Sequence, residues 1–332
     1  MATVSIEETD VSFDCPPHET ILRSGLRHGL GMPYDCSVGT CGECKIQLVD
    51  GKLQDNGGPR PAGLTERDVA RGRVLACQSV PDGDCTIGVH LEDRYARDIP
   101  PDYHSARLVS VESVSPEMML CSFATQSSAA YLPGQYARLQ IPGTSQWRAF
   151  SMANLPNEAG VWEFLIRVVP GGLASEYLFG SGRTGETFLM DAPYGNAYHR
   201  TGGRHVVCIA GGAGLAPTLA AARSAAIDPA CESILFVYGG RNPADLCAER
   251  FLSTFDRPGL AVEYSSIVSG DCPEWNGPKG FVHEHLEGRL EALKEAADYY
   301  VAGPPAMVDA VLTTLATNAA IPHDRIFYDR FF

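Results

Sequence analysis

Four cysteines in the first quarter of the sequence have the spacing of iron–sulfur ligands. Cys36, Cys41 and Cys44 lie within nine residues of one another. Cys77 follows after a further 32 residues. A rhombic [2Fe–2S] cluster needs four thiolates, three from one tight loop and one from a distant segment. The spacing therefore predicts such a cluster, with these four cysteines as its ligands.

The residues between the cysteines favour the same cluster. Gly39 and Gly42 separate the ligands, and glycine adopts positive φ freely, which lets backbone N–H groups turn toward sulfur. Such donors stabilise the added electron. Zinc is the main alternative, but structural zinc usually takes two short cysteine pairs. Cys77 has no nearby cysteine partner except Cys85, eight residues on.

This part of the sequence resembles the plant-type ferredoxins. The resemblance rests on Tyr-Asp-Cys-Ser-Val-Gly-Thr-Cys-Gly-Glu-Cys at residues 34–44 and Leu-Ala-Cys at residues 75–77. It covers about the first 92 residues and implies the β-grasp fold of that family. The other seven cysteines lack ligand spacing, and we expect them to be buried as small hydrophobic side chains.

A second motif, Arg-Ala-Phe-Ser at residues 148–151, carries groups that suit a flavin. A guanidinium matches a diphosphate through two hydrogen bonds. An aromatic ring can stack on the flavin, and a hydroxyl can bond to N5, where hydride arrives. Residues 167–175 then bring two glycines and a serine to the start of an expected helix, a site for the same diphosphate. The alternative is a plain β-barrel with an exposed arginine beside a buried phenylalanine.

Together these motifs resemble the FAD-binding barrel of the ferredoxin–NADP reductase superfamily, whose motif is Arg-x-Tyr-Ser. The resemblance implies that Arg148 and Ser175 bind the diphosphate. It also implies that Phe150 contacts the flavin and that Ser151 lies at N5, so these two are the expected catalytic residues. Phe150 replaces the family's tyrosine, which keeps the stacking and loses the phenol hydroxyl. The remaining expected flavin contacts are Arg167, Val168, Gly171 and Gly172.

Two turns in the last third of the sequence have the context of a dinucleotide site. Gly-Gly-Ala-Gly-Leu-Ala-Pro at residues 211–217 joins an expected buried strand to an expected helix. Ala-Gly-Pro-Pro at residues 302–305 is another strand-to-helix turn, and ligands of open α/β sheets bind at that edge. The expected nucleotide contacts are Gly211, Gly212, Gly214, Pro217, Gly303, Pro304 and Pro305.

These turns resemble signatures of the same superfamily, Gly-Gly-x-Gly-x-Ala-Pro and Cys-Gly-Pro-Pro. Ala302 replaces the cysteine that the family has near the nicotinamide, which argues against a catalytic thiol. At the end of the next expected strand, Arg241 has no acidic neighbour and can pair with the 2′-phosphate of NADPH. In the resembling family, however, Gly-x-Arg commonly accompanies NADH. We therefore expect Arg241 to lie at the nucleotide and NADH to be preferred over NADPH.

Composition narrows the class of protein. The 332 residues carry 26 basic and 40 acidic side chains, a net charge of −14, which disfavours nucleic-acid binding. The N-terminus lacks the basic start and apolar run of a signal peptide. The longest uncharged apolar stretch, residues 206–222, is interrupted by glycines and is too short for a membrane helix. We expect a cytoplasmic protein without a membrane segment, and a monomer.

The hydrophobic pattern predicts a multidomain chain, α+β and then α/β. Residues 1–92 are the predicted ferredoxin domain, with strands at 3–6, 11–13 and 45–49 and a helix around 21–26. Residues 93–102 hold two prolines and are a predicted linker. Residues 103–200 are the predicted antiparallel β-barrel, with strands at 106–111, 119–124, 136–141, 162–169 and 186–190. Residues 201–332 are the predicted parallel-sheet nucleotide domain, with strands at 206–210, 234–238, 261–268 and 299–302 and helices at 217–226, 284–296 and 305–317.

The order of cluster, flavin and nucleotide sites predicts a protein that converts a hydride into single electrons. The whole chain, including residues 326–332 with Phe332 as a further expected cofactor contact, resembles the reductase components of bacterial multicomponent oxygenases. That family's usual acceptor is a Rieske centre or a Rieske ferredoxin. The alternatives are a reductase for a di-iron monooxygenase or for a sugar deoxygenation enzyme, and a redox sensor without turnover. A membrane quinone reductase subunit is disfavoured because no membrane anchor is predicted.

Overall fold

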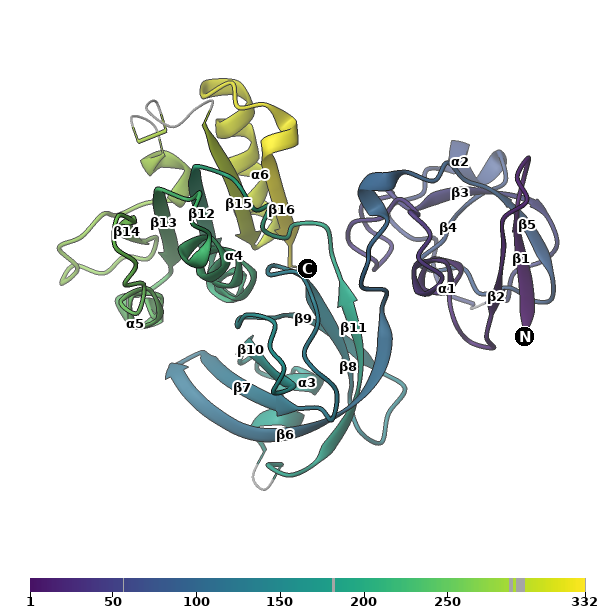
Figure 1. The fold of residues 1–332 in the computed structure, drawn as a ribbon, viewed down its shortest axis with the longest axis horizontal. Helices are drawn as coiled ribbons and strands as arrows, with labels where there is room; N and C mark the ends of the chain where they lie inside the picture. The colour runs from purple at the N-terminus through teal and green to yellow at the C-terminus, as the bar shows by residue number, and fades with distance from the viewer. Residues whose placement is uncertain (56, 181–182, 287–288, 291–295, 332) are drawn as a thin grey trace. The chain divides into compact units, whose positions relative to one another are not determined.

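The computed structural model describes all residues except 56, 181–182, 287–288, 291–295 and 332 (Figure 1). The chain divides into two compact units, Met1–Asp102 and Tyr103–Phe332. The boundaries of the three smaller domains inside this division remain predictions. In the part of the chain that the structure describes, no helix is both long enough and apolar enough to cross a membrane.

The first unit is a mixed five-stranded sheet packed against a short helix. The strand order is β2-β1-β5-β3-β4, in which β1 and β5 run parallel and the other neighbours antiparallel. Helix α1 begins after Thr20, whose hydroxyl caps the backbone N–H of Arg23, and buries Ile21, Leu22 and Leu26. The elements are β1 (Ala2–Ile6), β2 (Ser12–Cys15), α1 (Ile21–Arg27), β3 (Lys45–Asp50), α2 (Glu66–Ala70), β4 (Arg73–Leu75) and β5 (Cys85–Gly88).

The first half of the predicted linker packs onto this unit. Asp93–Tyr95 forms a single 3₁₀ turn, η1, and the Tyr95 side chain is buried. Its hydroxyl donates a hydrogen bond of 3.0 Å to Glu43 Oε1. The linker prediction rested on the two prolines at 100 and 101 and missed the buried tyrosine before them.

The second unit starts with a six-stranded sheet in the order β10-β7-β6-β11-β8-β9. A bridge between Met152 and Phe164 connects its two edges, so the sheet closes into the predicted barrel. The interior is aromatic, with Phe123, Trp162 and Phe188 fully buried. The elements are β6 (Asp102–Ser115), β7 (Met118–Ala124), β8 (Tyr136–Gln140), β9 (Trp147–Ser151), β10 (Val161–Arg167), α3 (Leu173–Phe179) and β11 (Thr187–Tyr194).

The rest of this unit is a five-stranded parallel sheet in the order β14-β13-β12-β15-β16. Successive side chains alternate between two buried faces, as parallel sheets require. Helix α4 packs on one face over Cys208 and Phe236, and α6 packs on the other over Val301. The elements are β12 (His205–Gly211), α4 (Leu215–Ile227), β13 (Ser233–Gly240), α5 (Glu249–Leu252), β14 (Ala261–Val268), β15 (Ala297–Gly303), α6 (Pro305–Thr313) and β16 (Ile326–Arg330).

Two predicted helices differ from the structure. The prediction for residues 284–296 falls largely on undescribed residues, and its described start belongs to a 3₁₀ turn, Val282–His285. The predicted helix 305–317 is α-helical only to Thr313 and continues as a π-helical turn, Thr314–Asn318. The hydroxyls of Thr313 and Thr314 bond to carbonyls four residues back, which competes with regular helix geometry.

Candidate functional site

The four predicted cluster ligands lie together as two pairs of thiols. A hydrogen bond from the Cys41 thiol lowers the pKa of Cys36 to about 4. A hydrogen bond from the Cys44 thiol likewise lowers the pKa of Cys77. Two pairs are the donor set of a two-iron cluster, in which each iron takes two protein ligands. Among the described residues, no group of three His, Cys, Asp or Glu side chains is placed to hold a single metal ion.

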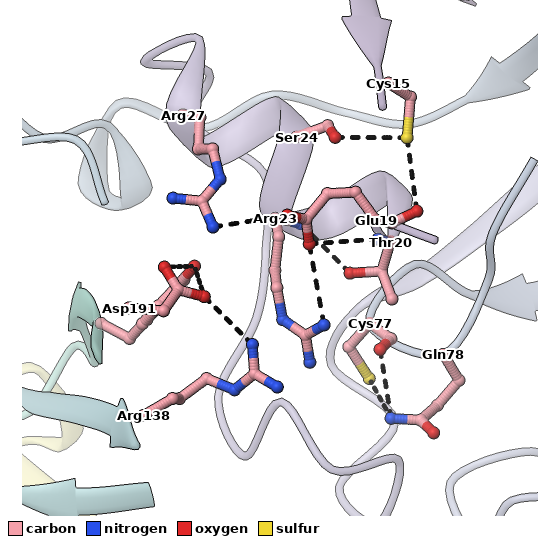
Figure 2. Close-up of polar contacts among 11 residues, drawn as sticks. Cys15, Glu19, Thr20, Arg23, Ser24, Arg27, Cys77, Gln78, Arg138 and Asp191 are labelled. Atoms are coloured by element: carbon pink, nitrogen blue, oxygen red, sulfur yellow. Dashed lines mark hydrogen bonds and ion pairs between the residues drawn. The ribbon is translucent and has the colours of Figure 1, made fainter. Parts of the chain in front are cut away.

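Amide donors surround these sulfurs. The backbone N–H of Cys41 lies 3.4 Å from Cys36 Sγ, and that of Glu43 lies 3.4 Å from Cys41 Sγ. The side-chain amide of Gln78 lies 3.6 Å from Cys77 Sγ (Figure 2). Donors aimed at sulfur favour the reduced, more negative form of a cluster. The chemistry of this loop therefore fits the predicted cofactor.

The loop backbone holds these donors by unusual geometry. Gly39 and Gly42 have φ of +87° and +80°, as predicted from their positions between ligands. A side chain on Gly42 would also meet the carbonyl of Gly63, 2.7 Å from the Cβ position. Ser37 has φ of +53°, and its buried hydroxyl has no hydrogen-bond partner among the residues that the structure describes. A hydroxyl placed so beside the ligands is satisfied when a cluster sulfur accepts its hydrogen bond.

The predicted flavin motif lies on β9, which pairs with β8 in the barrel. Ser151 is buried at the end of the strand, and Phe150 packs edge-on against Phe164 with ring centroids 6.5 Å apart. The exposed Arg148 donates only to its neighbours, 3.3 Å to Gln146 Oε1 and 2.8 Å to the carbonyl of Trp147. No described carboxylate pairs with Arg148. Its charge is therefore available for a diphosphate.

The loop between β10 and α3 contains the other predicted flavin contacts. Ser175 Oγ donates 2.7 Å to the carbonyl of Val169 and accepts from its N–H at 3.1 Å. Arg167 pairs with Glu117 at 2.6 Å, and the N–H of Val168 donates to the carbonyl of Glu117. Ser175 thus shapes the turn from inside, and its contact with a diphosphate remains a prediction. The same holds for Gly171 and Gly172, which form the turn before α3.

The two predicted nucleotide turns pack directly on each other. A Cβ on Gly214 would lie 2.0 Å from the carbonyl oxygen of Ala302 at the end of β15. Gly211 is confined by a side chain, because its Cβ would lie 2.5 Å from Met307 Sδ. Gly212 differs, since its φ is +55° and nothing lies within 4 Å of its Cβ position. The turn thus leaves open backbone at Gly212, where a nucleotide phosphate would approach.

The three predicted proline contacts lie at these turns. Pro217 lies in the first turn of α4, where proline is tolerated because that N–H needs no helical partner. Pro304 and Pro305 begin α6, with Pro304 as its N-cap. Phe332 lies outside the described residues, but the N–H of Phe331 donates 2.9 Å to the carbonyl of Gly303. The C-terminal segment therefore reaches one of the nucleotide turns.

At the end of β13, Arg241 is exposed and makes no ion pair with a described residue. Asp245, the first acid after the strand, accepts the backbone N–H of Asn242 at 2.9 Å. This bond caps a 3₁₀ turn and directs the carboxylate to its own loop. Arg241 is therefore the charged side chain that a nucleotide ribose would meet here.

Sequence reasoning missed a residue that connects the barrel to the nucleotide sheet. Arg223 on α4 donates 2.7 Å to the carbonyl of Ala153, two residues after Ser151. It also lies 3.6 Å from Glu163, and burial lowers its pKa. The signal in the sequence is a lone arginine in an alanine-rich helix. Ala153, Met118 and Leu165 of the barrel share one core with α4.

A buried histidine at the same junction was also missed. His199 is 4% exposed, and its Nδ1 lies 3.0 Å from the hydroxyl of Ser224 on α4. Its ring lies 5.8 Å from that of Tyr300 on β15. Burial lowers the pKa of His199 to about 4, so the ring is neutral at pH 7.

Three family models match successive parts of the chain. Residues 4–82 match the 2Fe-2S iron-sulfur cluster binding domain. Residues 105–199 match the oxidoreductase FAD-binding domain, and residues 208–313 match the oxidoreductase NAD-binding domain. The three matches fall in the predicted order of cluster, flavin and nucleotide.

Curated relatives match over nearly the whole length. Ferredoxin–NAD(P)(+) reductase CarAd of Metapseudomonas resinovorans is 37% identical over 96% of both chains. The anthranilate 1,2-dioxygenase electron transfer component of Acinetobacter baylyi is 34% identical over 94% of this chain and 91% of its own. The ferredoxin–NAD(+) reductase component of the alkene monooxygenase system of Xanthobacter autotrophicus is 35% identical over 96% and 98%.

Two solved structures have the same fold over the whole length of this chain. The ferredoxin reductase in carbazole 1,9a-dioxygenase aligns with a TM-score of 0.89 and 33% identity, covering 100% of this chain and 98% of that one. The cytochrome P450 reductase GcoB of Amycolatopsis aligns with a TM-score of 0.84 and 28% identity, covering 100% and 99%.

Proposed function

The chain belongs to the family of ferredoxin–NAD(P) reductases that serve as electron-transfer components of oxygenase systems, and we propose that it delivers electrons from NADH singly to a Rieske oxygenase or a Rieske ferredoxin. The observation that carries this proposal is the pairing of the four thiols in a chain that also holds the flavin strand and the nucleotide turns. Relatives of this layout are named for dioxygenase systems.

The residues of this chain have distinct tasks in the proposed reaction. Bound FAD would accept a hydride from NADH and release its two electrons one at a time to the [2Fe–2S] cluster. Arg148 would hold the diphosphate by charge-assisted hydrogen bonds. Phe150 would pack against the flavin ring, and the Ser151 hydroxyl would hydrogen-bond N5. Cys36, Cys41, Cys44 and Cys77 would bind the two irons.

The nucleotide turns support a nicotinamide dinucleotide as the electron donor, and the preference for NADH rests on the family resemblance at Gly-x-Arg, residues 239–241. Gly214 lets the turn after β12 approach the end of β15, while the open backbone at Gly212 supports a contact with the diphosphate. We propose that Arg241 lies at the adenosine ribose and that NADH is used in preference to NADPH. Steady-state kcat/KM for both nucleotides tests this, and a higher value for NADPH would overturn it.

A second acceptor class has support of its own. Relatives of similar coverage are named reductase components of monooxygenases, including phenol 2-monooxygenase of a Pseudomonas strain at 31% identity. The acceptor of this chain would then be a monooxygenase component, such as a di-iron enzyme. No observation favours a reductase for sugar deoxygenation. The two supported classes differ in the partner protein, while the path inside this chain is the same.

Turnover with a one-electron acceptor tests the proposed function. The purified holoprotein should oxidise NADH continuously while reducing an excess of cytochrome c. The rate should stay constant over many equivalents, because an enzyme is regenerated after each NADH. A single burst that stops after one NADH per protein would identify a redox sensor instead.

We also propose where and in what form the protein acts. None of the eleven cysteines, all of which lie in the described part of the chain, forms a disulfide, which suits a reducing compartment such as the cytoplasm. We expect a monomer that meets its acceptor transiently. Sedimentation of the holoprotein at micromolar concentration would contradict this if it gave a dimer mass.

A further inference from the structure

Arginines of the first unit gather in one segment beside the cluster loop. Residues 1–102 contain 17 acidic and 10 basic side chains. Four of those ten bases nevertheless lie within residues 60–73, which contain only two acids. An otherwise acidic unit therefore has one region of the opposite charge. The four arginines are Arg60, Arg67, Arg71 and Arg73.

This segment contacts the ligand loop near its start and leads to the fourth ligand, Cys77, after its end. At its start, the N–H of Gly63 donates 2.9 Å to the carbonyl of Gly39 in the ligand loop. At its end, the chain enters β4 and reaches Cys77 two residues after that strand. The adjoining surface of the ligand loop is bare, since Cys41 is exposed and the Val38 side chain is 54% exposed.

Two of the arginines carry charge that nothing in the described part of the unit neutralises. Asp68 faces inward, where it caps α2 and pairs with Lys45 at 3.0 Å and Arg73 at 3.3 Å. Arg67 and Arg71 point outward and form no ion pair with a described residue. They are four residues apart, so they lie on one face of α2, where like charges destabilise a helix.

The same segment also carries an exposed apolar residue. Val69 lies between the two arginines in the sequence, and its side chain is 50% exposed. Exposed apolar side chains ringed by charge are typical of surfaces that bind other proteins. Arg60, whose guanidinium lies 3.8 Å from the exposed Glu66 carboxylate, precedes Pro61, which packs on Gly39. Charge, exposed apolar surface and proximity to the cluster therefore coincide.

We propose that Arg60, Arg67 and Arg71, together with Val38 and Val69, form the docking surface for the electron acceptor, a protein with acidic side chains around its redox centre. This inference rests on the proposed function and names the chemistry of its partner. Opposite charges steer two proteins into encounter and orient them. Electron transfer falls steeply with distance, so an acceptor must dock where the cluster loop meets solvent.

The variants Arg67→Glu, Arg71→Glu and their combination test this surface. Lys52→Glu is the matched control, because Lys52 is exposed and its reversal changes the net charge equally. Lys52 follows the far end of β3, whose six residues place it about 20 Å from the cluster end of that strand. The acceptor probes are two heme proteins of opposite surface charge, the acidic cytochrome b5 and the basic cytochrome c.

At low ionic strength, each reversal on α2 should slow cytochrome b5 reduction about threefold, and the double variant about tenfold. Cytochrome c reduction should speed up in the same variants. Both effects should vanish at high salt, because screening removes steering. Lys52→Glu should resemble the wild type. Unchanged cytochrome b5 rates in the double variant at low salt would overturn the proposal.

A second measurement separates this proposal from the proposed function and from an internal role of the same surface. Absorbance changes on mixing with NADH, without acceptor, report reduction of flavin and cluster within the chain. If the wild type fails to reduce its own cluster, the proposed function fails. If only the α2 variants fail to do so, the arginines serve the chain's own flavin unit, and the docking proposal is overturned. We expect equal rates in all variants.

Discussion

A single guanidinium carries the positive charge at the predicted flavin strand. Arg148 is exposed, and its described hydrogen bonds go to neutral oxygens only. By contrast, Arg167 in the other flavin motif already has a carboxylate partner at 2.6 Å. Arg148 is therefore the residue whose loss should weaken FAD binding most.

Arg148→Ala should lose FAD. Removing a bidentate, charge-assisted hydrogen bond to the diphosphate costs about 1.5–3 kcal/mol of binding free energy, or roughly 10- to 150-fold in affinity. Flavin occupancy after gel filtration and dilution measures this. Arg107→Ala is the matched control, because Arg107 is also an exposed strand arginine of the barrel but lies on β6. Full occupancy in Arg148→Ala would show that the diphosphate lies elsewhere.

His199 should make the second unit sensitive to acid. Burial lowers its pKa from 6.5 to about 4, so the unfolded chain binds the proton more readily than the folded one. The neutral His199 ring therefore contributes to the free energy of unfolding in full above pH 6.5, and this contribution is lost as the pH falls toward 4. The total loss is on the order of 3 kcal/mol. His199→Asn should therefore show a smaller drop in melting temperature between pH 7.5 and pH 5 than the wild type. An equal drop in both would contradict this assignment.

Individual residues were predictable from sequence where their spacing along the chain carries the chemistry. The gathering of Cys36, Cys41 and Cys44 is of this kind, because these three cysteines lie in one short loop. Arg223 and His199 were missed because their partners, Ala153 and Ser224, are 70 and 25 residues away. Ser175 was predicted to face a ligand, yet its hydroxyl bonds to the turn it belongs to.

Among the elements, α4 has the most consequential position. It begins at the nucleotide turn, and its Arg223 holds the carbonyl of Ala153 just after the flavin strand β9. The helix thus sets how the flavin strand lies relative to the nucleotide turn. Hydride transfer needs the two reacting atoms close and aligned, and small misplacements cost rate.

Arg223→Met should slow flavin reduction by NADH without releasing either cofactor. Methionine keeps much of the packing and loses the hydrogen bond that connects α4 to Ala153. Stopped-flow reduction of the flavin should slow by about tenfold. A hydrogen bond to a charged group contributes roughly 1.5–3 kcal/mol. We expect part of that free energy to orient the flavin strand and the rest to stabilise the fold. Arg223→Lys should recover part of the rate. An unchanged rate in Arg223→Met would show that packing alone sets the orientation.

Strands were predicted better than the ends of helices. Residues 261–268 were predicted as a strand with the observed bounds, and most other strands differ by one to four residues at an end. Four strands, β4, β5, β9 and β16, were not predicted. The edge strand β16, Ile326–Arg330, was missed because only Ile326 is buried and the alternation is weak. Its place in the sheet is set by backbone pairing with β15, which leaves no pattern in the sequence.

The proposed function of the whole molecule requires the cluster to lie on the electron path from NADH to the acceptor. The cluster ligands belong to the first unit, and the flavin and nucleotide residues belong to the second. Cys85 is the nearest cysteine to Cys77 in the sequence, but it lies in β5, buried beside β1. It is therefore not placed to replace Cys77 as a ligand.

Cys77→Ser tests this claim most directly. The variant should lose or destabilise the cluster, since this iron site requires thiolate, while the second unit keeps its FAD. NADH oxidation with ferricyanide, which takes electrons from the flavin, should persist, and reduction of cytochrome c should fail. Retention of both activities would place the cluster off the path and contradict the account. Loss of both the ferricyanide and the cytochrome c activity, with FAD still bound, would make the cluster necessary for hydride transfer. That result would also contradict the proposed electron path.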